Sequence, residues 1–335
     1  MVDVAWSRCR GEECVRVRGG APGSADVQVR PRAGSLTVGT PPMAGRLVRD
    51  GGDLCFVPRF AFVEGTTYTV SMGDVVAAVL ARPRTERPAT TEVLAIHPSA
   101  TTVPRNLLRV YVRFSAPMRE GCASGHVRLV DDTGEPIVGA LLSTEHELWD
   151  STRRRLTVLL DPARIKRGLV AHRRLGYPLQ PGASFRLVVD RGYLDAQGVP
   201  LRAGAERRYE VAGDERRHVE PARWALAVPT AGTVDPFGVT FDRPLDHGLL
   251  ARCLDVLGPG RQPVPGTPEV GPDERSWRLL PREPWAADVH ELVVDPELED
   301  LAGNSLRRVF DRDLTRPEDA PRDVLEPVSV AFRPG

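Results

Sequence analysis

A repeated pattern of alternating hydrophobic residues constrains the fold of this chain more than any other feature. Apolar side chains occupy every second position from 108 to 114, and the pattern returns from 237 to 241. A period of two residues is typical of a β-strand with one buried face. Both runs end in a phenylalanine that is followed, three residues later, by proline, at Phe114 and Phe241. The sequence therefore predicts two copies of one β-strand and turn.

A second pair of segments extends the repeat. Leu-Val-Val-Asp occurs at 187–190 and at 292–295, and each is followed by a turn that contains Asp and Gly, at 195–198 and 300–303. Two shared segments in the same order indicate two copies of one β module. We expect one face of these strands to be buried, which predicts a core that includes Val110, Val112, Phe114, Leu187, Val189, Val239, Phe241 and Val293.

The beginning of the chain resembles a shorter, diverged copy, because residues 64–70 parallel residues 181–187. We therefore predict three modules, at 1–85, 86–214 and 215–314, followed by a tail at 315–335. The stretches 82–91 and 213–221 are rich in proline or polar residues and are expected to be linkers. In the tail, the apolar run from 328 to 332 is compatible with an additional edge strand.

The composition is that of an ordinary globular protein. Of the 335 residues, 41% are hydrophobic and 27% are charged, and 45 basic residues balance 45 acidic ones. No apolar run reaches the ~18–20 residues of a membrane-spanning helix. The balanced charge, together with basic residues that are scattered rather than interleaved with aromatic ones, argues against nucleic acid as a partner. Lys166 is the only lysine, a bias that an arginine-favouring codon usage explains.

The N-terminus and the cysteines bear on the compartment. The first residues show no basic start followed by an apolar core, so no secretory signal is visible and a cytoplasmic location stays open. An odd number of cysteines, five, implies at least one free thiol. Cys9 and Cys14 flank a four-residue segment between alternating runs, which places them nearly opposite each other on a hairpin and is compatible with a disulfide. The other three are expected in the core.

Several of these motifs together resemble the bacterial Ig-like domains of the SbsA type, a family named after a surface-layer protein. They are His97-Pro98, the strand ending Phe114-Ser115-Ala116-Pro117-Met118, a Gly-x-Ser/Thr-aromatic strand and an Asp-x-x-Gly-Asn turn. The resemblance covers about residues 92–314 well and 25–75 weakly. It implies an all-β chain of three tandem Ig-like β-sandwich modules on an extracytoplasmic bacterial protein, in the periplasm or at the cell surface. It implies little about activity, because this fold carries many unrelated functions.

An insertion distinguishes the middle copy. Trp149 follows Phe114 at nearly the spacing at which Trp277 follows Phe241, so the two tryptophans are predicted to be equivalent. Beyond them, the middle module has about 23 additional residues, essentially 161–182. Asp161-Pro162 is a helix-start signal and Gly168 a stop, which predicts a short helix. The insertion is rich in cations, which suits an anion. The candidate ligand-binding residues are Asp161, Arg164, Lys166, Arg167, His172 and, in a neighbouring segment, Asp150.

Two functions are compatible with these features. No catalytic motif is present, so we predict no catalytic residue, no metal ligand and no cofactor, and the chain is more compatible with a binding protein than with an enzyme. The first hypothesis is a non-enzymatic adhesion, assembly or binding module whose partner is a protein or a cell-envelope component. The second is an enzyme or small-anion-binding protein with its site on the insertion, which is otherwise a surface loop packed over a sandwich edge.

Overall fold

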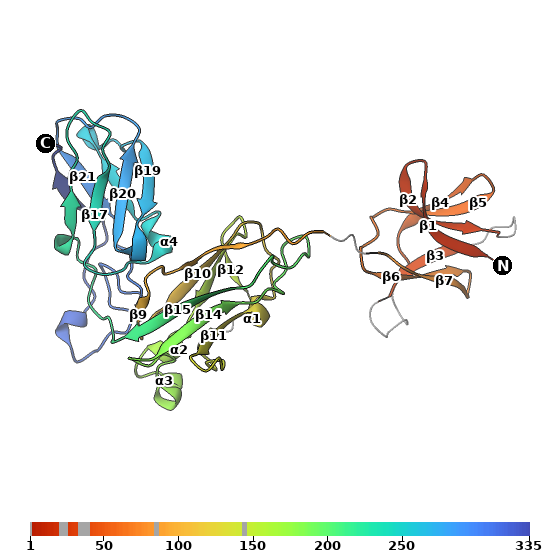
Figure 1. Ribbon diagram of the computed structural model, residues 1–335, viewed down its shortest axis with the longest axis horizontal. Coiled ribbons are helices and arrows are strands. Elements are labelled where there is room, and N and C mark those ends of the chain that lie inside the picture. The colour runs from red at the N-terminus through yellow and green to blue at the C-terminus, as the bar shows by residue number, and fades with distance from the viewer. Residues whose placement is uncertain (1, 20–25, 33–40, 84–86, 143–145) are drawn as a thin grey trace. The chain divides into compact units, whose positions relative to one another are not determined.

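The computed structural model describes residues 2–19, 26–32, 41–83, 87–142 and 146–335. The chain divides into two compact units, residues 1–87 and 88–335 (Figure 1). Strands dominate both units, and paired sheets of mostly antiparallel strands enclose three separate apolar clusters, so the predicted all-β fold of three Ig-like sandwiches is confirmed. In the described part of the chain, no helix is both long enough and apolar enough to cross a bilayer. Residues 84–86 of the first expected linker lie outside the described residues.

The first unit is a sandwich of a four-stranded and a three-stranded sheet. In spatial order, the four-stranded sheet contains β1 (Asp3–Cys9), β2 (Glu12–Arg18), β5 (Asp53–Pro58) and β4 (Gly45–Asp50). The three-stranded sheet contains β3 (Val27–Pro31), β6 (Thr67–Met72) and β7 (Val75–Ala81). Alternation divides the side chains of β2 between two faces. Val15 and Val17 enter the core, whereas Cys14 lies in a separate small cluster with Cys9 and Cys55.

The cysteine pairing differs from the expectation. The β1–β2 hairpin turns over two residues, Arg10 and Gly11, which both have positive φ as a tight hairpin turn requires. Cys9 therefore pairs with Glu12, and Cys14 pairs with Ser7, so the two cysteines are not opposite each other. All five cysteines are free thiols.

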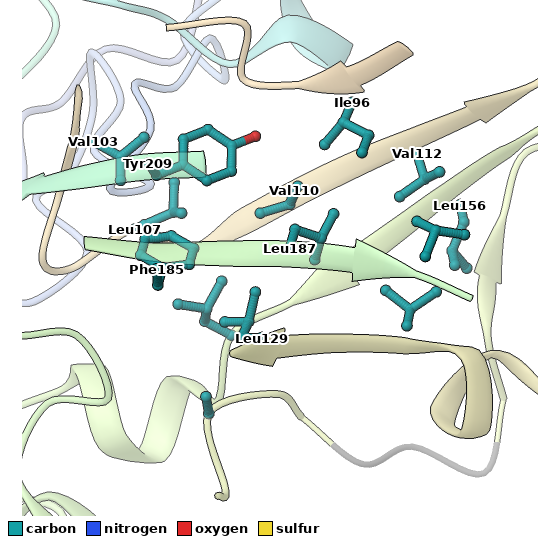
Figure 2. Packing of buried hydrophobic residues seen from close by; sticks show 14 of the residues in the cluster. Ile96, Val103, Leu107, Val110, Val112, Leu129, Leu156, Phe185, Leu187 and Tyr209 are labelled. Atoms are coloured by element: carbon teal, nitrogen blue, oxygen red, sulfur yellow. The ribbon is translucent and has the colours of Figure 1, made fainter. Parts of the chain in front are cut away.

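The second unit begins with the larger sandwich, whose two sheets have four strands each. In spatial order, one sheet contains β12 (Leu148–Trp149), β13 (Arg155–Leu159), β10 (Arg109–Phe114) and β8 (Val93–His97). The other contains β11 (Val127–Asp131), β14 (Ser184–Val189), β15 (Ala205–Ala212) and β9 (Thr102–Pro104). Figure 2 shows Val110 and Val112 of β10 and Phe185 and Leu187 of β14 among the packed core side chains. The helices are short: α1 (Ala123–His126), α2 (Pro162–Ile165) and α3 (Val170–Leu175).

The C-terminal sandwich repeats this plan with fewer strands. One sheet contains β16 (Ala225–Ala227), β17 (Phe237–Thr240), β20 (Ser276–Pro281) and β19 (Gly266–Val270). The other contains β18 (Leu254–Leu257), β21 (His290–Val294) and β22 (Val328–Phe332). Thus the run at 328–332 forms an edge strand on β21. The helical turns are α4 (His247–Leu250) and four 3-10 segments, η1 (Pro221–Arg223), η2 (Pro259–Arg261), η3 (Pro272–Glu274) and η4 (Pro317–Asp319).

Strand pairing corrects the predicted alignment of the two copies. Val112 of β10 pairs with Leu156 of β13, and Val239 of β17 pairs with Trp277 of β20. Trp277 is therefore the counterpart of Leu156, whereas Trp149 lies on the edge strand β12, so the predicted equivalence of the tryptophans is wrong. The insertion is accordingly shorter, since 31 positions separate Leu156 from Leu187 but 15 separate Trp277 from Leu292.

One predicted core residue is also wrong. Seven of the eight predicted residues are buried, but Val293 is only partly buried. Its neighbours Leu292 and Val294 enter the core instead, opposite Val256 and Leu254 of β18. In a Leu-Val-Val run the alternation does not determine which residues face inward, and the pairing partner decides it.

Candidate functional site

The insertion forms the predicted helix start. The Asp161 carboxylate accepts a hydrogen bond from the Ala163 amide at 2.9 Å, and Pro162 occupies the first position of α2. This is an N-cap with a proline at N1, which local sequence alone can specify. Arg164 then turns inward and is buried. Its guanidinium donates to five backbone carbonyls, those of Val138, Gly139, Leu175, Gly176 and Tyr177, at 3.0–3.3 Å. Arg164 thus holds the loop together.

Arg167 and Lys166 of the insertion contact residues 310–313 of the second unit. The Arg167 amide and Nε lie 2.9 and 3.1 Å from the two carboxylate oxygens of Asp311, and its Nη2 lies 3.5 Å from Asp313. Lys166 places its Nζ 4.2 Å from the centre of the Phe310 ring, a cation–π contact. The same Asp311 carboxylate accepts from Arg216 at 3.0 Å. The anion beside the predicted cationic residues is therefore a carboxylate of this chain.

The remaining two predicted residues lie apart from that contact. The His172 Nδ1 is hydrogen-bonded to the Arg164 carbonyl, and its ring packs edge-on against Tyr177. Asp150 caps the turn between β12 and β13, where its carboxylate accepts from the Arg154 and Arg155 amides at 2.9 and 3.0 Å. Five of the six predicted residues lie in the insertion, namely Asp161, Arg164, Lys166, Arg167 and His172. The sixth, Asp150, makes its contacts within its own turn.

A buried ion network joins the two sandwiches of the second unit. Arg109 and Tyr111 extend from β10 toward the residues that begin α4. The Tyr111 hydroxyl donates to Asp246 at 2.7 Å, and Arg109 forms ion pairs with Asp246, at 3.4 Å, and with Glu299. Burial, followed by the neighbouring Asp246 charge, raises the pKa of Tyr111, so its hydroxyl keeps its proton. Removing one member would leave a buried charge without its partner, so this network stabilises one arrangement of the two sandwiches.

Beside this network lies a second cluster of ionisable side chains, formed by two histidines and a buried glutamate. His97, at the end of β8 in the middle sandwich, stacks on His247 of α4 in the C-terminal sandwich, with ring centroids 3.4 Å apart and planes 15° apart. Both Nδ1 atoms face the same oxygen, Oε1 of Glu274, at 2.8 and 3.3 Å. The other oxygen of Glu274 accepts from the Ser99 and Ala100 amides at 2.6 and 3.2 Å.

The local turn explains how Glu274 reaches this place. Asp273 and Glu274 both lie in the left-handed region, with φ of 56° and 51°, which turns the chain sharply before β20. Non-glycine residues adopt this conformation at a cost, so contacts elsewhere must hold it. One such contact is the hydrogen bond from the Asp273 amide to the Ser99 hydroxyl at 3.0 Å. The strained turn therefore inserts a carboxylate from one sandwich into the other.

The charge state of the cluster follows from its contacts. Burial alone would raise the pKa of Glu274, but the adjacent His247 and His97 imidazoles and the hydrogen bond from the Ser99 amide lower it to about 2. The carboxylate is thus an anion near neutral pH. Glu274 is fully buried, while the side chains of His97 and His247 are 16% and 26% exposed, so the two rings form the accessible side of the site.

Two imidazole nitrogens and one carboxylate oxygen, all within 4.8 Å of one another, form a donor set that suits a proton or a transition-metal ion. Sequence reasoning missed these three residues, because 150 positions separate His97 from His247. The one signal was His97-Pro98, which the family resemblance includes only as a motif of the module. The corresponding position in the C-terminal copy, Ala227, carries no ligand.

No family model matches the chain, and no curated protein sequence matches it. Solved structures similar to it include the FN1–FN3 domains of chicken CNTN1, with 10% identity over 98% of both chains and a TM-score of 0.23. The MG0-NIE-MG1 domains of Escherichia coli alpha-2-macroglobulin show 11% identity over 62% of this chain and 67% of that one, with a TM-score of 0.24. Domains 4–9 of surface layer protein SbsC show 9% identity over 97% of this chain and 42% of that one, with a TM-score of 0.21. Overlaps of this size carry no argument about function.

Proposed function

We propose that this chain is a non-enzymatic binding or assembly module of SbsA-type Ig-like sandwiches that acts outside the cytoplasm of a bacterium, with a protein or cell-envelope component as partner. The observation that supports it most directly is the buried network of Arg109, Asp246 and Glu299. A junction held by buried charges makes residues 88–335 a stiff double sandwich, as a spacer or presenting arm requires.

The insertion fits the same proposal. Arg164 binds carbonyls of the insertion and of Val138, and Arg167 binds Asp311, so these cations stabilise the chain itself. The alternative, a small-anion site at Arg167 and Lys166, would require an external anion to displace the Asp311 carboxylate. It predicts that an Asp311→Asn variant binds phosphate or sulfate at this place, and that the parent does not.

The first unit offers an edge for a partner. Strand β7 carries no charge and, in the described part of the chain, pairs only with β6. Its residues Val75, Val76 and Val79 are 70%, 58% and 50% exposed. An uncharged edge strand is a template for an additional strand, because its backbone groups lack partners on one side. We propose that an extended, apolar segment of the partner pairs with β7 and covers these valines.

The test uses the full chain. A Val76→Lys, Val79→Lys variant should lose binding to an envelope fraction from the source cells, whereas Val138→Lys should not. Val138 is a matched control because it is an 85% exposed valine in the second unit. Equal binding by both variants would overturn the role of β7. Cell fractionation tests the compartment separately, and recovery of the chain only in the cytosol would overturn the extracytoplasmic assignment.

A further inference from the structure

We propose that His97, His247 and Glu274 bind a divalent transition-metal ion, for which Zn²⁺ is the probe, and that this ion fastens the two sandwiches of the second unit to each other. This site goes beyond the proposed binding function and does not depend on the partner. It uses one ligand from the first sandwich and two from the second.

The donor types favour such an ion. Imidazole nitrogen binds zinc, copper, nickel and cobalt well, whereas calcium and magnesium prefer oxygen ligands in larger number. Zn²⁺ takes nitrogen and oxygen ligands at about 2.0–2.2 Å in a tetrahedron, which places the ligand atoms roughly 3.3–3.5 Å from one another. The Nδ1 atoms of His97 and His247 already lie 2.8 and 3.3 Å from Oε1 of Glu274. The two distances between Nδ1 and Oε1 therefore need to change by only a fraction of an ångström. One of the two stacked rings must also rotate, because a metal ion lies in the plane of each imidazole that binds it.

An unsatisfied nitrogen is the second observation. The Nδ1 of His247 is buried, faces the Glu274 carboxylate, and makes no hydrogen bond of good geometry. Buried polar atoms normally have a partner, so an orphaned one calls for an explanation. A metal ion between this nitrogen and the carboxylate would supply the missing partner.

The surroundings support a preorganised ligand. The second oxygen of Glu274 accepts from two backbone amides, those of Ser99 and Ala100, and this leaves Oε1 for the ion. Hydrogen bonds to the non-coordinating atoms of a ligand fix its orientation and strengthen metal binding. The partial exposure of both rings gives an ion access to the site.

The experiment measures Zn²⁺ binding by the chelator-treated full chain in competition with a chromophoric chelator. We expect one ion at this site, and at least about tenfold weaker binding in His97→Asn and in His247→Asn. Asparagine keeps an N–H near the position of Nδ1 in both variants, so the His97 hydrogen bond to Glu274 and the fold are retained. His126→Asn, which changes a similarly exposed histidine of the same unit, is the control and should bind as the parent does.

Zinc should raise the melting temperature of the parent and of His126→Asn, but not that of the two ligand variants. Cys9, Asp50 and Cys55 of the first unit form another potential metal group, so Co²⁺ absorption distinguishes the sites. Visible d–d bands without a near-ultraviolet thiolate band support the histidine site. Absence of Zn²⁺ binding, binding unchanged in both asparagine variants, or a thiolate band that accounts for all bound Co²⁺ would overturn the proposal.

Discussion

The turn before β13 carries Arg153 in the middle sandwich, and the equivalent turn before β20 carries Glu274 in the C-terminal sandwich. Both residues have positive φ, 54° and 51°, and both carbonyls accept the equivalent amide, from Met118 at 2.9 Å and from Leu245 at 3.0 Å. Arg153 is exposed, whereas Glu274 is fully buried against the neighbouring sandwich. The backbone of the module is thus the same in both copies, and the side chain at one strained position distinguishes a solvent-facing turn from a junction.

The largest difference in stability is expected between variants in which the side chain at one or the other of these two turn positions is truncated to alanine. Glu274→Ala should lower the free energy of unfolding of the second unit by about 3 kcal/mol or more, because the Ser99 and Ala100 amides and the His97 imidazole lose their acceptor. Arg153→Ala should cost under about 0.5 kcal/mol. Both variants place alanine at the same positive φ, so the backbone cost cancels. Urea denaturation of the two variants measures the difference, and equal losses would show that the junction carries no special stability.

Acid should remove the same contribution. The pKa of Glu274 is lowered from its ordinary value of 4.5 to about 2 in the folded chain. A lowered carboxyl pKa stabilises the fold above the unfolded pKa, and this stability is lost as the pH falls through the folded pKa. We therefore expect the stability advantage of the parent over Glu274→Gln, about 3 kcal/mol at pH 7, to decline between pH 4.5 and 2.

Glu274 is contacted by the imidazoles of His97 and His247 and by the Ser99 and Ala100 amides. Because the two chains differ only at residue 274, the decline in the difference between them reports on this carboxyl group. Urea titrations of the parent and Glu274→Gln at several pH values test this, and an advantage that persists at pH 2 would contradict the assignment.

Two buried tyrosines of the same sandwich give a finer comparison between junction and core. The Tyr111 hydroxyl donates to Asp246 across the junction, whereas the Tyr193 hydroxyl is buried in the core without a hydrogen-bond partner. Tyr111→Phe should therefore cost about 1–2 kcal/mol, and Tyr193→Phe should be neutral or stabilising. Calorimetric melting of both variants tests this, and a larger loss for Tyr193→Phe would reverse the comparison.

The smallest effect is expected at the lone lysine. A guanidinium can also lie over the Phe310 ring, so Lys166→Arg should change the stability by less than about 0.5 kcal/mol. Arg167→Ala, which removes the side-chain bonds to Asp311, should cost more. If Lys166→Arg impairs binding to a partner without changing the melting temperature, the site requires a compact amine and the insertion contributes to recognition.

Local sequence determined the parts that depend on neighbouring residues. Alternation placed Val110, Val112 and Phe114 in the core, because a strand directs every second side chain to one face. The Asp161-Pro162 pair specified the start of α2, because the cap and the first turn involve only adjacent residues. These interactions have short range, so the order of residue types is sufficient to predict them.

Tertiary structure alone decided the rest. Val293 lost its predicted place in the core because its register depends on β18, and Trp277 corresponds to Leu156 because of pairing with β17. The cluster of His97 and Glu274 joins residues 177 positions apart, from two sandwiches. Nothing in their local sequence distinguishes these residues from surface residues, since their burial, their charge and their proximity arise only when the sandwiches pack together.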